Sequence, residues 1–359
     1  MDPAALRAHF PVFESVAYLN AGSCGPLPAV ALRAAAKSAR TAARQGRGKA
    51  YFDETLKLRA ALRAAYAGVV AGRPEDVALT TSASDGMVRV LGGLGLRRGD
   101  QVLTADGEHP GLYGPLAAAR KQIGITVRSV PLEQIAEAVT PRTRLVACSH
   151  VGWISGSLAP AALAEIGREV PVLLDGAQGA GAVPVDVAAL GCAFYAAAGQ
   201  KWLCGPVGTG LLWVAPSWRE RLTARAPTYV NLSAPARGLQ ADAWDDARGL
   251  DAPALSNEAM IAALAAHDVL AEAGWPAVHQ RAVSLAAAFA ERLRETGRAV
   301  AVRGPTTLVA WEQRDPEAAA ARLSAAGITV RPLPGTPYLR ASVGAWNDET
   351  DLERLLTAL

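Results

Sequence analysis

The sequence lacks several short motifs that usually mark a nucleotide or hydrolytic site. It contains no Gly-x-Gly-x-x-Gly after an expected strand, no P-loop, no His-Glu-x-x-His and no Gly-x-Ser-x-Gly. A nicotinamide dehydrogenase, a nucleotide hydrolase or a serine hydrolase would each need one of these motifs or a substitute for it. The chemistry of the chain must therefore rest on other residues.

Cysteine and net charge are also low. The four cysteines form neither Cys-x-x-Cys nor a zinc-binding spacing, so we expect no metal site and a reduced, cytoplasmic protein. The net charge is only +3 and basic residues are spread along the chain, which predicts neither a nucleic-acid nor a membrane partner. The first 13 residues carry Asp2 and lack the apolar core of a signal peptide.

Hydrophobic residues are abundant, at 51% of 359. Up to about residue 225, short apolar runs alternate with Ala-rich segments of helical spacing, which predicts a doubly wound α/β core. The expected strands are 77–80, 101–104, 126–130, 144–149, 171–175, 193–197 and 209–214. The expected helices are 28–45, 52–70, 84–95, 111–123, 160–168, 257–273, 277–297, 315–326 and 348–358. The middle strands are apolar without alternation, as in a parallel sheet that is covered on both faces.

The pattern changes in the C-terminal third. A stretch rich in Pro, Gly and Asp (226–256) leads into two long helices and then into runs such as TTLVAWE and PYLRASV. This favours a second, smaller α+β domain. We expect an N-terminal segment (1–17) that packs on the small domain, a large domain (18–230) and a small C-terminal domain (231–359).

Lys201 is unusual among the five lysines, because it alone lies in an uncharged neighbourhood, AAAGQKWLCG. An apolar pocket lowers the pKa of a lysine and leaves a nucleophilic amine, which can form a Schiff base with a carbonyl cofactor. The alternative is a lysine that extends from a strand end to water.

Asp175 ends an apolar strand in LLDGAQGAG, at the edge of the sheet where open α/β folds bind ligands. Pyridoxal phosphate (PLP) needs a carboxylate that keeps its pyridine nitrogen protonated. Gln178 can donate a hydrogen bond to the phenolic oxygen of the same ring. The alternative for Asp175 is a helix N-cap.

Two further segments suit this cofactor. TTSASDGM (80–87) follows a strand and opens a helix, so the backbone N–H groups of Ala83, Ser84 and Asp85 and the Ser84 hydroxyl can hold a phosphate. In DGEHPG (106–111), His109 can stack on a pyridine ring. The alternatives are an ordinary helix cap and a histidine on a surface loop.

The combination of Asp175, Gln178 and Lys201 before WLCGPVGTG resembles the class V aminotransferase group of fold-type I PLP-dependent enzymes, which includes cysteine desulfurases. Other stretches resemble the cysteine/cystine C–S lyases within it. They are YLNAGSCGPLP, DGEHPG, RLVACSHVGWISG, DGAQGAGAVPVD, KWLCGPVGTG, PTYV and the pair Arg331 and Arg340. The resemblance implies a large domain with a mostly parallel seven-stranded sheet, a smaller α+β domain, and a homodimer with active sites at the subunit interface.

The resemblance also implies roles for individual residues. Lys201 forms the Schiff base with PLP and later moves the Cα proton, Asp175 pairs with the pyridine N–H, and His109 stacks on the ring. Arg340 binds the substrate α-carboxylate, with Arg331 assisting. Trp153 either lines the side-chain pocket or is a core aromatic.

The chain departs from the family on the phosphate side. Ala198 stands where members usually carry Ser or Thr, Gln200 where they carry His, and Ala254 where a Thr of the neighbouring subunit helps. Gln200 can still donate a hydrogen bond but brings no charge. These departures predict looser phosphate binding or another donor.

The segment 325–340 lacks the cysteine that a persulfide-relaying desulfurase needs. We therefore expect a PLP-dependent lyase that acts on cysteine, cystine or a related amino acid. It would give pyruvate, ammonia and a thiol or persulfide. The alternatives are a class V aminotransferase or epimerase, and a relative that binds PLP without turnover. Cys24 is expected to be a small buried thiol, with a substitute nucleophile as its alternative, and Cys204 a packing residue.

Overall fold

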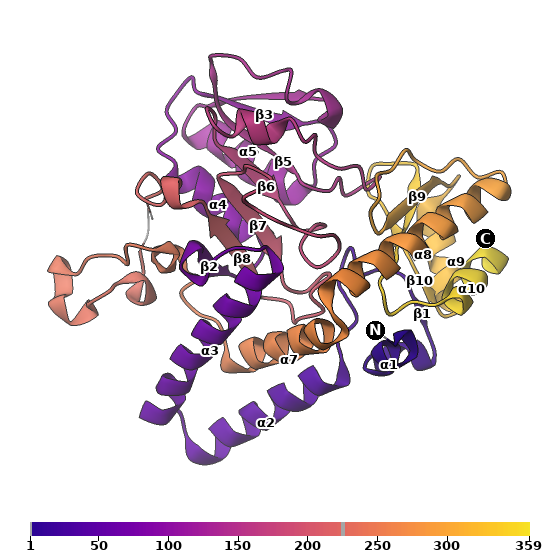
Figure 1. Ribbon diagram of the computed structural model, residues 1–359, viewed down its shortest axis with the longest axis horizontal. Coiled ribbons are helices and arrows are strands. Elements are labelled where there is room, and N and C mark those ends of the chain that lie inside the picture. The colour runs from indigo at the N-terminus through magenta and orange to yellow at the C-terminus, as the bar shows by residue number, and fades with distance from the viewer. Residues whose placement is uncertain (1, 224–226) are drawn as a thin grey trace.

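The centre of the protein, in this computed structural model, is a seven-stranded sheet (Figure 1). The structure describes residues 2–223 and 227–359; Met1 and residues 224–226 of the predicted N-terminal segment and large domain lie outside it. All strands but β8 run in one direction. Their order is β2 (Val77–Thr80), β8 (Gly210–Val214), β7 (Phe194–Ala198), β6 (Val172–Asp175), β5 (Thr143–Ser149), β3 (Gln101–Ala105) and β4 (Thr126–Val130).

Helices cover both faces of this sheet, which explains why its strands are apolar without alternation. On one face, α4 (Ala83–Gly93) and α5 (Pro110–Gln122) pack against side chains such as Leu173. On the other face, α3 (Lys49–Val69) and α7 (Asn257–Ala273) pack against side chains such as Leu174. The predicted α/β class and mostly parallel sheet are confirmed.

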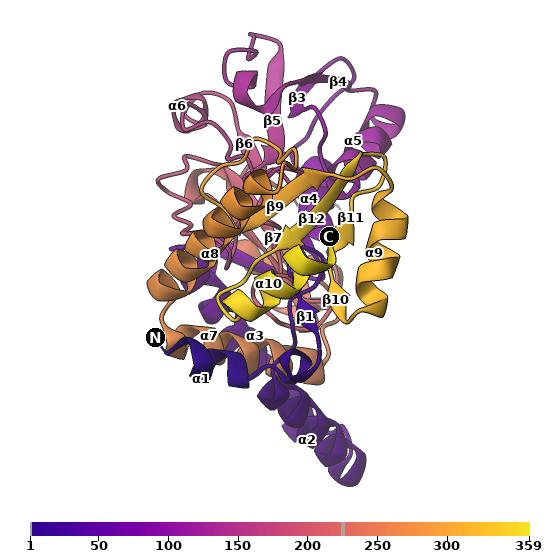
Figure 2. The ribbon, with the colours of Figure 1, turned by 90° about the vertical axis from the view of Figure 1, so that its right-hand side faces the viewer.

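A second layered unit follows in the C-terminal part (Figure 2). Its antiparallel sheet has the order β11 (Arg331–Pro332), β12 (Tyr338–Ser342) and β9 (Leu308–Glu312). Apolar side chains of this sheet share one core with α8 (Trp275–Glu295), α9 (Pro316–Ala325) and α10 (Glu349–Ala358). This is the α+β architecture that the change of pattern indicated.

The N-terminal segment contacts this unit through strand pairing and through ion pairs. Strand β1 (Ala17–Tyr18) pairs in parallel with β10 (Ile328–Thr329). Arg7 lies in the short helix α1 (Pro3–Ala8) and forms ion pairs with Asp351 at 2.6 Å and with Asp348 at 3.3 Å. Helix α2 (Ala29–Gln45) then runs beside α7 (Figure 1).

Helix α7 packs with the large domain, although the sequence analysis assigned 231–359 to the small one. Its Met260 and Ala263 belong to the same apolar core as α3 and the sheet. Gly274, at φ +86°, then turns the chain into α8. Other side chains of α7, such as Ala266, share a core with Val278 of α8, so α7 contacts both units and the division at residue 230 stays a prediction.

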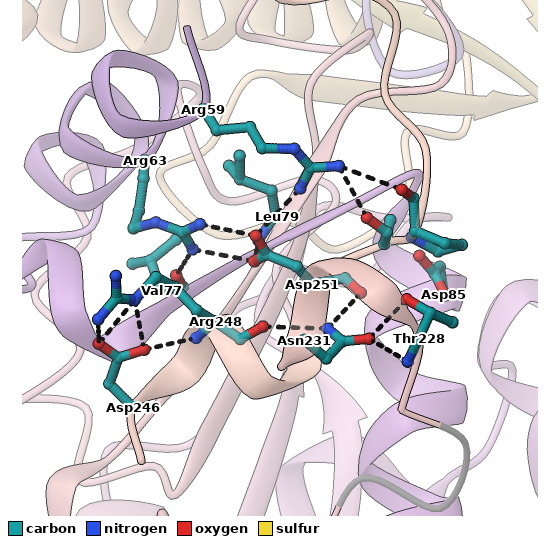
Figure 3. A network of polar contacts seen from close by, with 12 residues as sticks. Arg59, Arg63, Val77, Leu79, Asp85, Thr228, Asn231, Asp246, Arg248 and Asp251 are labelled. Atoms are coloured by element: carbon teal, nitrogen blue, oxygen red, sulfur yellow. Dashed lines mark hydrogen bonds and ion pairs between the residues drawn. The ribbon is translucent and has the colours of Figure 1, made fainter. Parts of the chain in front are cut away.

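A buried ionic network fixes the segment before α7 to the large domain (Figure 3). The Asp251 carboxylate accepts hydrogen bonds from Arg59, Arg63 and the backbone N–H of Leu79 on β2. All three charged side chains are buried. Each partner compensates the desolvation of the others, so the network stabilises only as a complete set.

The predicted elements agree with the observed ones, apart from one helix. The segment predicted as a helix over 160–168 contains only the four-residue α6 (Leu163–Ile166), and turns surround it. Gly167 there lies against the carbonyl of Gly191, so closely that a Cβ on Gly167 would clash with that oxygen. None of the helices in the described parts of the chain has the length and hydropathy that a membrane crossing needs.

Candidate active site

The carboxyl ends of β3, β5, β6 and β7 surround a small cavity beside the C-terminal unit. Parallel strands present such a crevice at one edge of an open α/β sheet. The side chains that line it include most of the candidates named from the sequence. They are His109, Ser149, Val151, Trp153, Asp175, Ala177, Gln178 and Lys201.

Lys201 lies in a tight turn three residues after β7. The carbonyl of Lys201 accepts the N–H of Cys204, and the carbonyl of Gly199 accepts the N–H of Gly205. Burial and the nearby charge of Arg340 together lower the pKa of the Lys201 amine to about 8, although the charge of Asp175 opposes them. Among the described residues the amine has no ion-pair partner. The Lys201 side chain lines the cavity and is only partly exposed, so its amine is available to react there.

Cys204 completes this turn with an unusual backbone conformation. Its φ is +53°, a left-handed value that residues other than glycine rarely adopt, and its side chain is buried. The thiol packs in the apolar core between the N-terminal segment and α7.

Asp175 is the last residue of β6 and is buried. One carboxylate oxygen accepts the N–H of Ala177 at 2.9 Å. Burial raises the pKa of Asp175, whereas the Lys201 ammonium and the Ala177 N–H lower it. The segment 177–179 forms turns, so the alternative in which Asp175 caps a helix does not apply.

Gln178 is held at both ends of its amide. Its nitrogen donates to the carbonyl of Gly22 at 2.7 Å, and its oxygen accepts the indole N–H of Trp202 at 2.9 Å. One N–H of the amide remains for a ligand oxygen. The contact of Gln178 with the phenolic oxygen of PLP stays a prediction.

His109 and Trp153 form one wall of the cavity. Their rings make an edge contact, with centroids 5.1 Å apart. The His109 Nδ1 accepts the N–H of Gly111 at the start of α5, which leaves the proton of the neutral ring on Nε2. Burial, together with Lys201 and Arg340, lowers the pKa of His109 to about 4. The ring is therefore neutral at physiological pH. Trp153 is a wall of this site and also donates to the carbonyl of Gly107.

Arg340 comes from β12 and reaches the large domain. It is 2% exposed, donates to the carbonyl of Trp153, and has no carboxylate partner among the described residues. Its Nε has no partner either. Burial and the neighbouring charge of Arg331 lower the pKa of Arg340 to about 9. Arg331 stands directly opposite on β11 and is exposed. Two facing cations that have no anionic partner in the described part of the chain are typical of a carboxylate-binding site.

The phosphate side is only partly free. Ser82 caps α4 by accepting the N–H of Asp85, and the Asp85 carboxylate binds Thr81 and Arg89. The N–H of Asp85 is therefore already used, contrary to the sequence analysis. Ala83 and Ser84 remain at the first turn of α4.

The side-chain oxygen of Gln200 is buried with no partner among the described residues. Ala198 is buried and Ala254 is exposed. Phosphate binding by Ala83, Ser84 and Gln200 stays a prediction, as does the assistance of a second subunit at Ala254.

The segment YLNAGSCGPLP, named above for its resemblance to the C–S lyases, closes the cavity from the N-terminal side. A Cβ on Gly22 would lie 2.8 Å from the Arg340 guanidinium, and a Cβ on Gly25 would clash with the carbonyl of Lys201. The glycines of YLNAGSCGPLP are therefore needed for this close approach. Cys24, between them, is exposed, so the expectation of a buried thiol is wrong.

A buried amine, a buried carboxylate and a neutral imidazole at one sheet edge suit the ring of PLP. Together with the mixed sheet and the C-terminal unit, they define a PLP-dependent enzyme of fold type I. The model of the family "Aminotransferase class-V" matches residues 17–355. The chain belongs to this family, and PLP is its cofactor.

Curated relatives carry two different names. An isopenicillin N epimerase from Amycolatopsis lactamdurans is 34% identical over 226 residues, which cover 58% of this chain and 56% of the relative. A probable cysteine desulfurase from Methanothermobacter thermautotrophicus is 33% identical over 225 residues, which cover 58% and 55%. The chain thus matches little more than half the length of these relatives.

Solved structures match over nearly the whole chain. The cystine C–S lyase C-DES, in complex with its reaction product cysteine persulfide, is 29% identical with a TM-score of 0.88, covering 97% of this chain and 98% of that one. A C-DES mutant with glycine covalently linked to its PLP cofactor is 28% identical with a TM-score of 0.89, covering 98% of both chains.

Proposed function

We propose that the chain is a PLP-dependent lyase that cleaves the C–S bond of cysteine, cystine or a related sulfur amino acid. The products are pyruvate, ammonia and a thiol or persulfide. The observation that carries the proposal is the shared cavity of Lys201 and Asp175, next to an Arg340 that has no carboxylate partner among the described residues. The similarity to the cystine lyase C-DES over 97% of the chain supports the choice of substrate class.

Each residue then has a distinct task. Arg340 binds the α-carboxylate of the substrate and so points its Cα into the cavity. The Lys201 amine takes the Cα proton, Asp175 holds a proton on the ring nitrogen, and His109 covers one face of the ring. PLP, when bound, supplies an electron sink for the Cα carbanion. The Cα–H electron pair becomes a Cα=Cβ bond as the Cβ–S pair leaves on sulfur, and water then converts the enamine to pyruvate and ammonia.

Two observations separate this proposal from persulfide relay and from epimerisation. The β11–β12 region, where segment 325–340 lies, contains no cysteine to accept sulfur. An epimerase must return a proton to Cα from the opposite face. His109 lines the cavity with its pKa lowered to about 4, so its ring is neutral at physiological pH and is a weak acid for returning that proton. Epimerase activity remains the second candidate because of the 34% identical relative.

The test is product analysis with purified protein and added PLP. We expect L-cystine or L-cysteine to yield pyruvate, and Lys201→Ala to abolish it. Accumulation of the D-isomer without pyruvate would identify an epimerase. Transfer of the amino group to an added keto acid would identify an aminotransferase. Cofactor binding with no product from any substrate would identify a binding-only relative.

We also propose a cytoplasmic homodimer with active sites at the subunit interface. The four cysteines are unpaired, which suits a reducing compartment. Large apolar side chains are exposed on α2, on α3 and in the segment before α7. They are Leu32, Phe52, Leu56, Tyr229 and Leu239. Sedimentation equilibrium tests the proposal: we expect a dimer, and a monomer for Phe52→Asp with Leu56→Asp. A monomeric wild-type chain would refute it.

A further inference from the structure

Glu108 is a buried carboxyl group that the proposed reaction does not use. It is 4% exposed and lies in the loop after β3, one residue before His109. One of its oxygens accepts the backbone N–H of Ser149 at 2.7 Å, and the other pairs with the Ser149 hydroxyl. Among the described residues it has no cationic partner. A buried carboxylate is costly unless other groups compensate it, and here both hydrogen bonds come from a single residue, Ser149.

The contact joins two strand ends across the site. Ser149 is the last residue of β5 and stands beside Asp175 in the β5–β6 register. Glu108 therefore ties the loop that carries His109 to the strand end next to Asp175. Trp153 holds the same loop from the other side, since its indole donates to the carbonyl of Gly107 at 2.7 Å. The backbone of His109 is thus fixed immediately before its ring enters the cavity.

Some groups around Glu108 favour its protonated form and others favour its ionised form. Burial and the charge of Asp175 raise the pKa of Glu108 to about 7, while the Ser149 N–H and hydroxyl and the backbone N–H of His109 lower it. The charge of Glu108 also contributes to the raised pKa of the buried Cys148 thiol. In either protonation state the Ser149 N–H can donate to one carboxyl oxygen, so the tether persists through neutral pH.

We propose that Glu108 is a positioning residue which, through Ser149, holds the neutral His109 ring against the cavity. The proposal deepens the proposed function, because it concerns the same site. It does not depend on which substrate is cleaved. Its test uses protein without substrate, so it can fail or succeed independently of the lyase activity.

The test is a pH titration of the histidines in the full chain, in which NMR of ¹³C-labelled histidine reports the pKa of each ring. A His109→Asn variant identifies the His109 signal by its loss. In Glu108→Ala we expect the His109 pKa to rise from about 4 toward the ordinary value of about 6.5, because the freed loop exposes the ring to water. In Glu108→Gln, which keeps an acceptor for the Ser149 N–H, we expect it to stay near the wild-type value.

The direction of the shift separates positioning from electrostatics. Removing a nearby negative charge would by itself lower a histidine pKa, and Glu108→Gln removes the same charge as Glu108→Ala. His279, which is buried on α8 with its pKa lowered to about 4, reports on the fold and should not change. An unchanged or lowered His109 pKa in Glu108→Ala would overturn the proposal.

A second variant covers the case in which His279 moves together with His109. Ser149→Ala removes only the hydroxyl half of the tether and adds no buried charge. We expect a smaller upward shift of His109 with His279 constant, and a weaker affinity for PLP that Glu108→Gln does not show. A downward shift of His109 in Ser149→Ala would refute the tether, because the remaining Ser149 N–H bond allows at most a small upward shift.

Discussion

The lowered pKa of Lys201 makes the sharpest prediction of the structure. At a pKa of about 8, about one-tenth of the amine is unprotonated at pH 7, compared with about 0.03% for a lysine at its ordinary 10.5. Lys201 should therefore carry about 300-fold more reactive amine than an unperturbed lysine. The difference arises from burial and from Arg340, with Asp175 opposing both.

Competitive labelling of the cofactor-free chain measures this directly. A small amine reagent is applied in trace amounts over a range of pH, and the peptide of each lysine is quantified by mass spectrometry. The other four lysines, at positions 37, 49, 57 and 121, are exposed and serve as internal references. We expect labelling of Lys201 to rise through a midpoint near pH 8.

Two variants test the cause of the shift, because they should move the midpoint in opposite directions. Asp175→Asn removes the charge that raises the Lys201 pKa, so the midpoint should fall. Arg340→Met removes a charge that lowers it, so the midpoint should rise. A wild-type midpoint near 10.5, or shifts of the same sign in the two variants, would refute the reasoning.

Four further substitutions test substrate binding, stability and the exposed thiol. Arg340→Lys keeps the charge but loses the bidentate fork, and should raise the KM for L-cystine about 10-fold to 100-fold with a smaller change in kcat; steady-state kinetics measure it, and an unchanged KM would remove Arg340 from substrate binding. Asp251→Ala leaves two buried guanidinium groups uncompensated and should lower the free energy of unfolding by about 3–5 kcal/mol. Glu291→Ala breaks an exposed ion pair with Arg294 and should change the free energy of unfolding by less than about 1 kcal/mol. Urea titration measures both variants. Cys24→Ser should leave pyruvate formation unchanged; a large loss of rate would make the exposed thiol part of the reaction.

Local sequence patterns predicted most of the fold, because they reflect contacts that each element makes on its own. Helix α7 was predicted over 257–273 and spans those residues, with Ser256 as its cap. The apolar runs of β5 and β6 indicated a sheet covered on both faces, and the two apolar cores confirm it. Asp175 and Lys201 could be placed near each other because each lies at or just after the end of a strand, and strand ends of a parallel sheet meet at one edge.

Residues joined only by long-range packing could not be predicted in the same way. The pattern of α7 does not reveal which domain it contacts, and that depends on α3, some 200 residues earlier. The exposure of Cys24 depends on how the N-terminal segment crosses the site. Glu108 had a signal in DGEHPG, next to His109, but its partner Ser149 lies 41 residues away.

The charges of the site suggest how substrate binding and proton transfer are coupled. Arg340 lowers the proton affinity of Lys201, because both cations are buried close together. A substrate carboxylate on Arg340 offsets that charge and so raises the proton affinity of the amine. In the cofactor-free protein the lysine is therefore a reactive nucleophile, and in the proposed reaction it becomes a stronger base once the carboxylate is in place. In that proposal, one arginine on β12 both orients the substrate and tunes the group that removes its Cα proton.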